Sequence, residues 1–175
     1  MTWTVDSVHS HVGFSVRHMM VTTVRGQFHT YSGQASLDAT DFTKSSFSGE
    51  IDVTSIDTAN SDRDNHLRTG DFFDVARFPK IGFTSSAITK QGDGEFKVTG
   101  QLTLRGVTKP VELVVEFAGT SKNPRTGQTV AGLSARGSIS RKDYGMEFNA
   151  VLDTGGLMVS DGVKLELDLQ LVQGA

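Results

Sequence analysis

Two closely spaced histidines near the start of the chain are the first candidates for chemistry. His9 and His11 are two residues apart, so on a strand they would share a face and could bind a metal ion through their ring nitrogens. No third ligand follows nearby in the sequence, and a solvated or hydrogen-bonded pair explains both residues more simply. We therefore expect no metal site at this position.

A second candidate is the run Asp62–His66, whose side chains are spaced like those of a calcium loop. Leu67 occupies the sixth position, where such a loop needs a glycine for its sharp turn. Ser61 followed by Asp64 is instead typical of the start of a helix, and Gly70 of its end. The segment 61–70 is therefore predicted to be a short helix.

Other catalytic signatures are missing from the sequence. No stretch has the Gly-x-Ser-x-Gly spacing of a serine-hydrolase nucleophile. Gly92-Asp93-Gly94 precedes a strand and not a helix that could hold a phosphate, so it indicates a hairpin turn. The chain has no cysteine, which excludes disulfides, thiolate metal sites and cysteine nucleophiles. These patterns predict no catalytic residue, no metal and no cofactor.

Length and charge narrow the class of protein further. The 175 residues suffice for a single all-β core, and we expect one domain over residues 1–175. The net charge is -3 with basic and acidic residues intermixed, so nucleic acid is not an expected partner. Met1–Asp6 has neither a basic start nor an apolar run. We expect a cytoplasmic protein without an integral membrane segment, or a periplasmic one if a leader has been removed.

Period-two alternation of apolar and polar residues is the strongest structural signal. It is clearest over 163–171, where Val163 and four leucines alternate with charged or amide side chains. The same alternation appears at 12–18, 47–53, 96–104 and 111–117. Short polar turns separate several of these runs, so the strands are predicted to be antiparallel neighbours. Glycines inside the strands permit bulges and bending, which favours a closed all-β barrel over flat sheets.

The apolar residues are of types that suit an irregular cavity. The chain has 11 Phe but only 1 Trp and 2 Tyr, and methionines lie near expected chain bends. Flexible methionines and flat rings can line hydrophobic cavities, although each residue taken singly is more often an ordinary core residue. Composition by itself therefore does not establish a cavity.

Four segments carry a resemblance to a known family. They are Trp3–Asp6 with His9-Ser10 and Phe14–Met19; Arg63–Leu67 with Asp71–Asp74 and Phe78-Pro79; Gly100–Val111; and Arg141–Met146. These segments resemble motifs of the YceI-like, lipocalin-like polyisoprenoid-binding proteins. Together they span nearly the whole length of the chain. The resemblance implies an eight-stranded antiparallel lipocalin-like barrel with one or two short helices. It also implies a non-enzymatic carrier whose interior holds a polyprenol, polyprenyl phosphate or isoprenoid quinone.

Alternation and the resemblance together give a set of expected lipid-binding residues. They are Phe14, Val16, His18, Met20, Phe28, Arg63, His66, Leu67, Phe72, Phe73, Phe83, Leu102, Leu104, Tyr144 and Phe148. The partner is expected to be an isoprenoid or other long-chain lipid, and a homodimer stays open as an alternative to a monomer.

The predicted helix is expected at the mouth of the barrel. Leu67 would anchor it, leaving Arg63 and His66 at its edge to meet the polar head of the cargo, while Asp64 and Arg68 would pair toward solvent. An ordinary surface helix with Arg63 in an internal salt bridge explains the same residues equally well.

Two other functions remain open at this stage. An enzyme acting on an apolar substrate would draw its acid–base groups from His18, His66, Asp64 or Tyr144. A barrel without ligand, used for protein interaction or in a stress response, would need the apolar rows only as its core.

Overall fold

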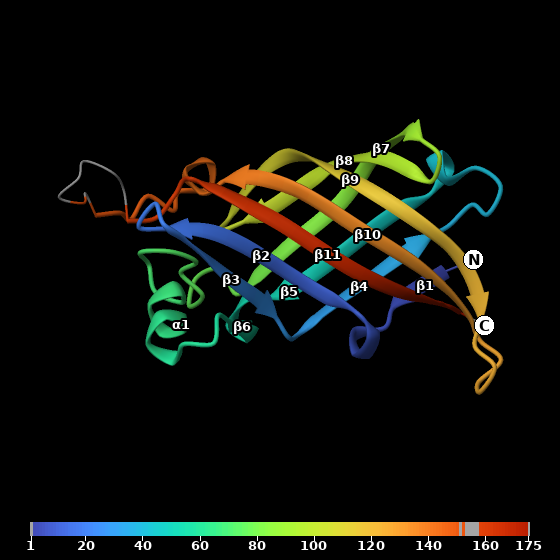
Figure 1. The fold of residues 1–175 in the computed structure, drawn as a ribbon, viewed down its shortest axis with the longest axis horizontal. Helices are drawn as coiled ribbons and strands as arrows, with labels where there is room; N and C mark the ends of the chain where they lie inside the picture. Colours follow the sequence, from blue (N-terminus) through green and yellow to red (C-terminus); the bar gives the residue numbers. More distant parts are fainter. Residues whose placement is uncertain (1, 151, 153–157, 175) are drawn as a thin grey trace.

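A computed structural model of the chain describes residues 2–150, 152 and 158–174 and is almost entirely β-structure (Figure 1). The strands are β1 (Thr2–Val5), β2 (His11–His18), β3 (Thr22–Phe28), β4 (Tyr31–Ser36), β5 (Ser46–Asp52), β6 (Ile56–Asp57), β7 (Lys80–Gly92), β8 (Glu95–Leu104), β9 (Val107–Lys122), β10 (Thr129–Ser140) and β11 (Gly162–Gln173). The helices are α1 (Ser61–Leu67) and the short 3-10 turns η1 (Ser7–His9), η2 (Phe42–Lys44), η3 (Val53–Ser55) and η4 (Arg141–Tyr144). In the described part of the chain no helix is long and apolar enough to cross a membrane.

The sheet closes on itself into an eight-stranded antiparallel barrel. Hydrogen-bonded neighbours follow the order β1-β4-β5-β7-β8-β9-β10-β11, and β11 pairs again with β1 through Trp3 and Gln173. Closure removes the unpaired edges that an open sheet would expose. The predicted all-β, eight-stranded lipocalin-like barrel with a short helix is therefore confirmed.

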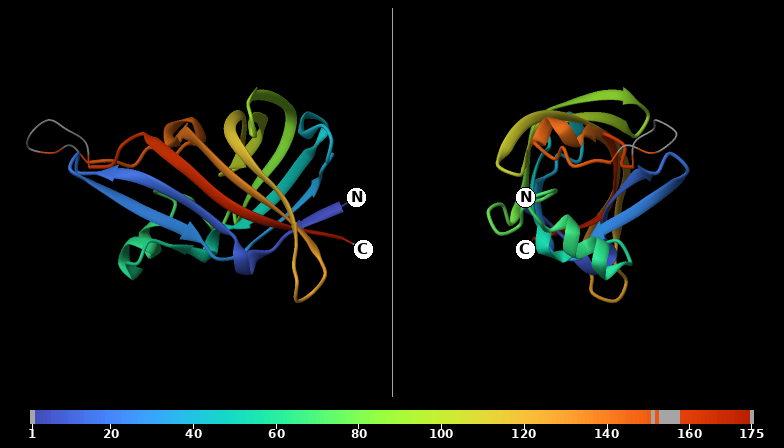
Figure 2. Two further views of the ribbon diagram at one scale, coloured as in Figure 1. Left: turned by 45° about the vertical axis from the view of Figure 1, so that its right-hand side comes forward. Right: turned by 90° about the vertical axis from the view of Figure 1, so that its left-hand side faces the viewer.

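Three strands of the barrel are bent and continue beyond the closed ring. β1 continues into β2 after η1, β5 continues into β6 after η3, and β3 and β4 are separated only by residues 29–30. β2 pairs with both β11 and β3, and β3 pairs with β6. These continuations lengthen the wall toward α1, at the end of the molecule opposite the two termini (Figures 1 and 2).

Two apolar clusters fill the two ends of the barrel. Near the termini, the Phe42 ring is stacked on Phe117 and lies 4.4 Å from the Phe96 ring, measured between centroids. Toward α1, Ile56 and Tyr144 are among the most deeply buried side chains of the second cluster. The apolar rows predicted from alternation supply residues to both clusters.

Helix α1 forms within the predicted segment 61–70 but ends at Leu67, with Arg68 and not Gly70 at its C-cap, and its first cap and charged residues also differ from the prediction. The N-cap is Asn60, whose side-chain oxygen accepts from the backbone N–H of Arg63 at 2.9 Å, and not Ser61. Asp64 is buried and accepts from the backbone N–H and hydroxyl of Thr58. Arg68 donates to the carbonyls of Thr54 and Ile56. The predicted Asp64–Arg68 pair in solvent is therefore wrong, because the face that carries both residues packs toward β6.

The buried Asp64 carboxylate gives a direct test of how α1 is held. Asp64→Ala removes an acceptor from Thr58, and we expect the free energy of unfolding to fall by about 2–3 kcal/mol. Asp62→Ala, an exposed carboxylate on the same helix, should cost less than about 1 kcal/mol. Urea unfolding of both variants measures the difference, and equal losses would show that the Thr58 contact does not anchor the helix.

Candidate functional site

A cavity of about 430 Å³ lies inside the barrel and is lined by members of both apolar clusters. This volume is typical of cavities that hold small organic ligands. The wall follows the predicted alternation, since every second residue of β11 from Val163 to Leu171 faces the cavity. Residues 12, 14, 16 and 18 of β2 and 111, 113 and 115 of β9 do the same.

Glycines keep the interior of the barrel open at particular places. A Cβ atom on Gly26 would lie 2.3 Å from the Phe14 ring, and one on Gly100 would lie 2.5 Å from the Phe83 ring. Each ring therefore packs over bare backbone and takes up less of the lumen. Gly33 and Gly49 are directly paired across β4 and β5, so the wall there carries no side chain on its inner face.

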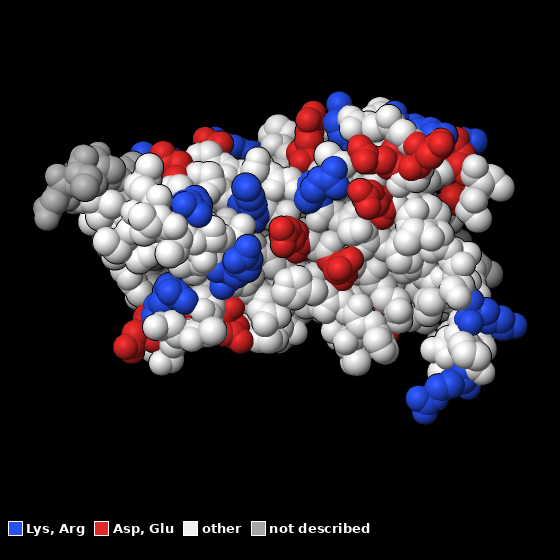
Figure 3. Space-filling view, viewed as in Figure 1, with Lys and Arg blue, Asp and Glu red and all other residues white. Residues whose placement is uncertain are grey.

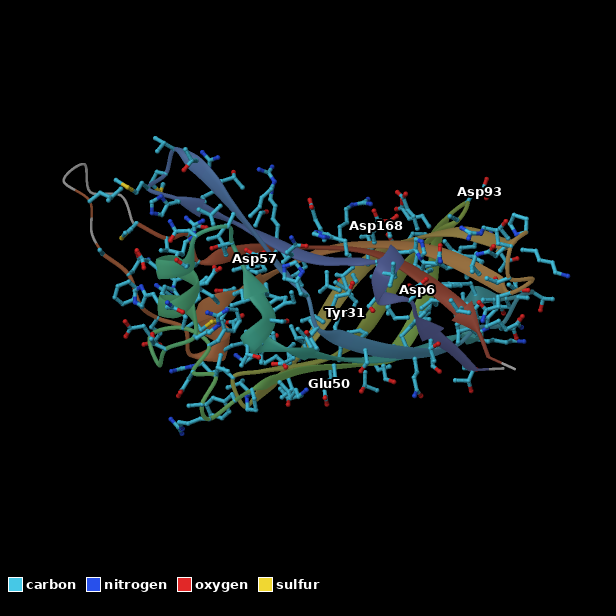
Figure 4. The ribbon with its side chains drawn as sticks, turned by 90° about the horizontal axis from the view of Figure 1, so that it is seen from below. Asp6, Tyr31, Glu50, Asp57, Asp93 and Asp168 are labelled. Atoms are coloured by element: carbon cyan, nitrogen blue, oxygen red, sulfur yellow. The ribbon has the colours of Figure 1, made fainter. Side chains whose placement is uncertain are left out.

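The polar side chains on the wall gather at the α1 end of the cavity. They include His18 at the end of β2, Thr58 just before α1, His66 on α1, and Arg141 after β10. Ser32, Gln34, Ser48 and Glu50 also border the cavity, but they alternate with the inward residues and are exposed. Figure 4 shows Glu50 at the outer edge of the wall and Tyr31 between the strands. The cavity is thus apolar along its length and polar at one end.

Arg63 borders the cavity and is held by Thr58. Its Nε donates to the Thr58 hydroxyl at 2.8 Å, and its Nη2 donates to the Thr58 carbonyl at 2.6 Å. Thr58 also donates its hydroxyl to Asp64, so one threonine connects the cation and the carboxylate. These contacts fix the direction of the guanidinium without a direct ion pair to Asp64.

His66 connects α1 to the segment after η4. One ring nitrogen lies 2.8 Å from an Asp71 carboxylate oxygen. The imidazole centroid is 5.1 Å from the Phe72 ring and 5.0 Å from the Phe148 ring, both in edge-to-face geometry. The three rings are in mutual contact and all line the cavity at this end.

Arg141 is a buried cation that sequence reasoning did not place in the site. Its side chain donates to the carbonyls of Ser160, Met146 and Phe148 at 2.9, 2.7 and 2.8 Å. Burial lowers the pKa of the guanidinium, and the nearby Asp161 carboxylate opposes that shift. An arginine directly after a strand is usually exposed, so only the Arg141–Met146 segment of the family resemblance could have signalled it.

Most of the residues expected to bind lipid do line the cavity. They are Phe14, Val16, His18, Phe28, Arg63, His66, Leu67, Phe72, Phe73, Phe83, Leu102, Leu104 and Phe148. Contact of these residues with a lipid remains a prediction.

Two of the expected residues lie elsewhere. Met20 is 60% exposed on the turn between β2 and β3, because the strand ends at His18 and its alternation stops there. Tyr144 is buried within η4, behind the cavity wall. Both placements correct the sequence-based assignment.

Only two of the four candidate acid–base residues border the cavity. His18 and His66 border the cavity, whereas Asp64 and Tyr144 do not. Burial raises the pKa of the Tyr144 phenol, which makes this group a poorer acid at neutral pH. Among the residues that the structure describes, no three His, Asp or Glu side chains form a possible metal site. His9 lies in η1 rather than on a strand, so it shares no strand face with His11, and its ring lies 2.7 Å from Asp6.

Comparison with known proteins agrees with this architecture. A family model described as YceI-like domain matches residues 3–171. UPF0312 protein SA2479 of Staphylococcus aureus (strain N315) is 41% identical over 164 residues, which are 94% of this chain and 93% of the relative. The crystal structure of Burkholderia cenocepacia BcnA has a TM-score of 0.83 at 26% identity and covers 95% of this chain and 98% of that chain. A polyisoprenoid binding domain from Saccharophagus degradans has a TM-score of 0.71 and 98% coverage of both chains, and its 16% identity supports the fold alone.

A charge placed on the inner face of β11 tests the assignment of the cavity. Leu167 lines the lumen, whereas its neighbour Glu166 is exposed on the outside of the barrel. Leu167→Lys should abolish uptake of an uncharged apolar fluorescent probe, because a lone ammonium in an apolar interior costs several kcal/mol. Glu166→Lys introduces the same side chain on the opposite face and should leave uptake unchanged. Equal uptake by both variants would show that the probe binds outside the barrel.

Proposed function

The chain belongs to the YceI-like domain family, and we propose that it binds and carries a long isoprenoid lipid inside its barrel without catalysing a reaction. The observation that carries this proposal is a closed barrel whose apolar cavity has its polar groups at one end. A long apolar chain with one polar head matches this distribution. The Saccharophagus degradans neighbour, described as a polyisoprenoid binding domain, shares the barrel fold in which such a ligand would lie.

Burial of the apolar chain supplies enough free energy for binding. About ten methylene-like carbons at ~0.8 kcal/mol each give about 8 kcal/mol, nominally micromolar affinity before the costs of association. Selectivity would then depend on the length and width of the cavity, which is wider where the Phe14 and Phe83 rings pack over glycine.

The polar end of the cavity suits the head of such a lipid. Arg63 and His66 border the cavity on one side of α1, and Thr58 directs the Arg63 guanidinium. A phosphate or a quinone oxygen could accept hydrogen bonds from these groups. We therefore propose polyprenyl phosphates and isoprenoid quinones as the candidate cargo.

Catalysis is disfavoured by the positions of the acid–base candidates. The Asp64 carboxylate accepts hydrogen bonds from Thr58, and Tyr144 is buried in η4. Two of the four candidate acid–base groups therefore do not line the cavity in which a substrate would lie. His66 contacts Asp71 and two aromatic rings, which explains its position by packing. A carrier accounts for the same residues with fewer assumptions.

Native mass spectrometry of freshly purified protein, followed by organic extraction, tests the proposal. We expect an added mass that the extraction releases as an unmodified isoprenoid lipid. Purified candidates added to the delipidated protein should restore the same complex. Chemical conversion of the lipid would support an enzyme, and failure of every isoprenoid to bind would overturn the proposal.

The proposed head-group contact can be tested separately. Arg63→Ala should weaken binding of a phosphorylated polyprenol by about 1.5–3 kcal/mol more than binding of a neutral quinone, because a charge-assisted hydrogen bond is lost. Arg68→Ala is the matched control, since Arg68 is on the same segment and contacts backbone carbonyls but does not line the cavity. It should affect both ligands equally. The same equal effect in Arg63→Ala would exclude the contact.

A further inference from the structure

The turn between β2 and β3 presents three apolar side chains to solvent. Met19 is 44%, Met20 60% and Val21 71% exposed. They follow directly after His18, which lines the α1 end of the cavity, and the Met19 N–H donates to the Met158 carbonyl on the same rim. We call residues 19–21 the apolar tip. An exposed apolar surface therefore lies beside the polar end of the cavity.

The backbone of the apolar tip is strained for the residues that it carries. The Val21 N–H donates to the His18 carbonyl, and the two residues between them have φ of 51° and 63°. This is a hairpin turn that needs positive φ at both central positions, for which Asn-Gly is the preferred pair. Methionine carries a Cβ atom, which makes positive φ costly, whereas glycine has none. Two methionines at these positions disagree with local folding preference, which is expected at sites that serve function.

Basic side chains on the outer face of the barrel lie behind the apolar tip. Lys164, Ser15 and Arg25 are aligned across β11, β2 and β3, and Arg17 is one row nearer the tip. In the described part of the chain, none of the three cations forms an ion pair. Farther from the tip, β11 carries the exposed Glu166 and Asp168 instead. Figure 3 shows blue side chains across this half of the face, and red ones nearer the middle and along the upper and lower edges.

We propose that the apolar tip inserts into an anionic lipid bilayer, so that the polar end of the cavity faces the membrane. Exposed methionine and valine can enter the head-group boundary, while Arg17, Arg25 and Lys164 attract the negative surface. This inference rests on the proposed carrier function and adds the partner from which the lipid is loaded. The same end of the barrel would then serve binding and delivery.

The test uses flotation of the full chain with vesicles of phosphatidylcholine alone and with equal parts of phosphatidylcholine and phosphatidylglycerol. We expect binding to the mixed vesicles that weakens as salt is added. The double variant Met19→Asn with Met20→Gly should bind at least about tenfold less. This variant installs the preferred turn residues, so it should fold at least as stably as the unmodified chain. Val8→Asn is its control, because Val8 is 83% exposed on η1 away from the tip.

Charge reversal tests the electrostatic part. Arg25→Glu with Lys164→Glu should reduce binding to the mixed vesicles by about thirtyfold or more. Lys122→Glu with Arg125→Glu makes the same charge change at the end of β9 and in the turn after it, near the termini, and should have little effect. Equal losses in both double variants would indicate that net charge, and not the basic face, is responsible.

Uptake of a short soluble isoprenol distinguishes failure of this inference from failure of the carrier proposal. The tip variant should take up the dissolved isoprenol normally but extract a long isoprenoid from vesicles slowly. No isoprenol uptake by the unmodified chain would contradict the carrier alone. The membrane inference would be overturned if the tip variant bound vesicles as well as the unmodified chain. It would also be overturned if the unmodified chain did not bind vesicles and instead formed a dimer through the apolar tip.

Discussion

Closure of the sheet through β11 is the constraint on which the rest of the structure depends. Because β11 pairs with β1 near the termini and with β2 nearer α1, one strand joins the ring and its extension. Backbone hydrogen bonds are then satisfied around the wall, and the interior needs no polar group to complete them. Stability can come from the wall and the two end clusters. The lumen between them is free to remain a cavity.

The two ends of the barrel contain different kinds of side chain, aromatic at one end and partly polar at the other. Near the termini, Phe42 and its aromatic neighbours pack into an apolar cluster. At the other end, α1 and the segment after η4 meet through the His66 and Phe148 rings and bring polar groups with them. The buried Arg141 holds that segment through several carbonyls. A charge is retained there because its donors satisfy backbone groups that the irregular segment leaves unpaired.

This polarity gives the molecule a direction along its axis. The apolar interior, the polar groups around α1, and the apolar tip with its basic face follow one another toward the same end. A ligand with a long tail and a polar head has the same order of properties. The proposed cargo and the proposed membrane contact are therefore linked by geometry, since the head of the lipid and the bilayer would meet at one place.

The sequence by itself determined five of the strands, several of the turns, the position of the short helix and most of the cavity wall. Alternation has a period of two whatever lies next to the strand, so Val163 to Leu171 and Phe14 could be assigned to an inner face once a closed barrel was expected. The family resemblance supplied the number of strands. Local signals were sufficient for these features because they depend on neighbours in sequence.

Only the tertiary structure decided the features that depend on distant segments. Arg141 is buried because carbonyls from later residues converge on it, and Asp64 turns inward because Thr58 lies beneath α1. Met20 lies outside the cavity wall because β2 ends at His18, and Tyr144 does not line the cavity because it is buried within η4. A polar side chain follows its available partners, and an apolar one follows the available volume. Both are set by chain segments that sequence spacing does not bring together.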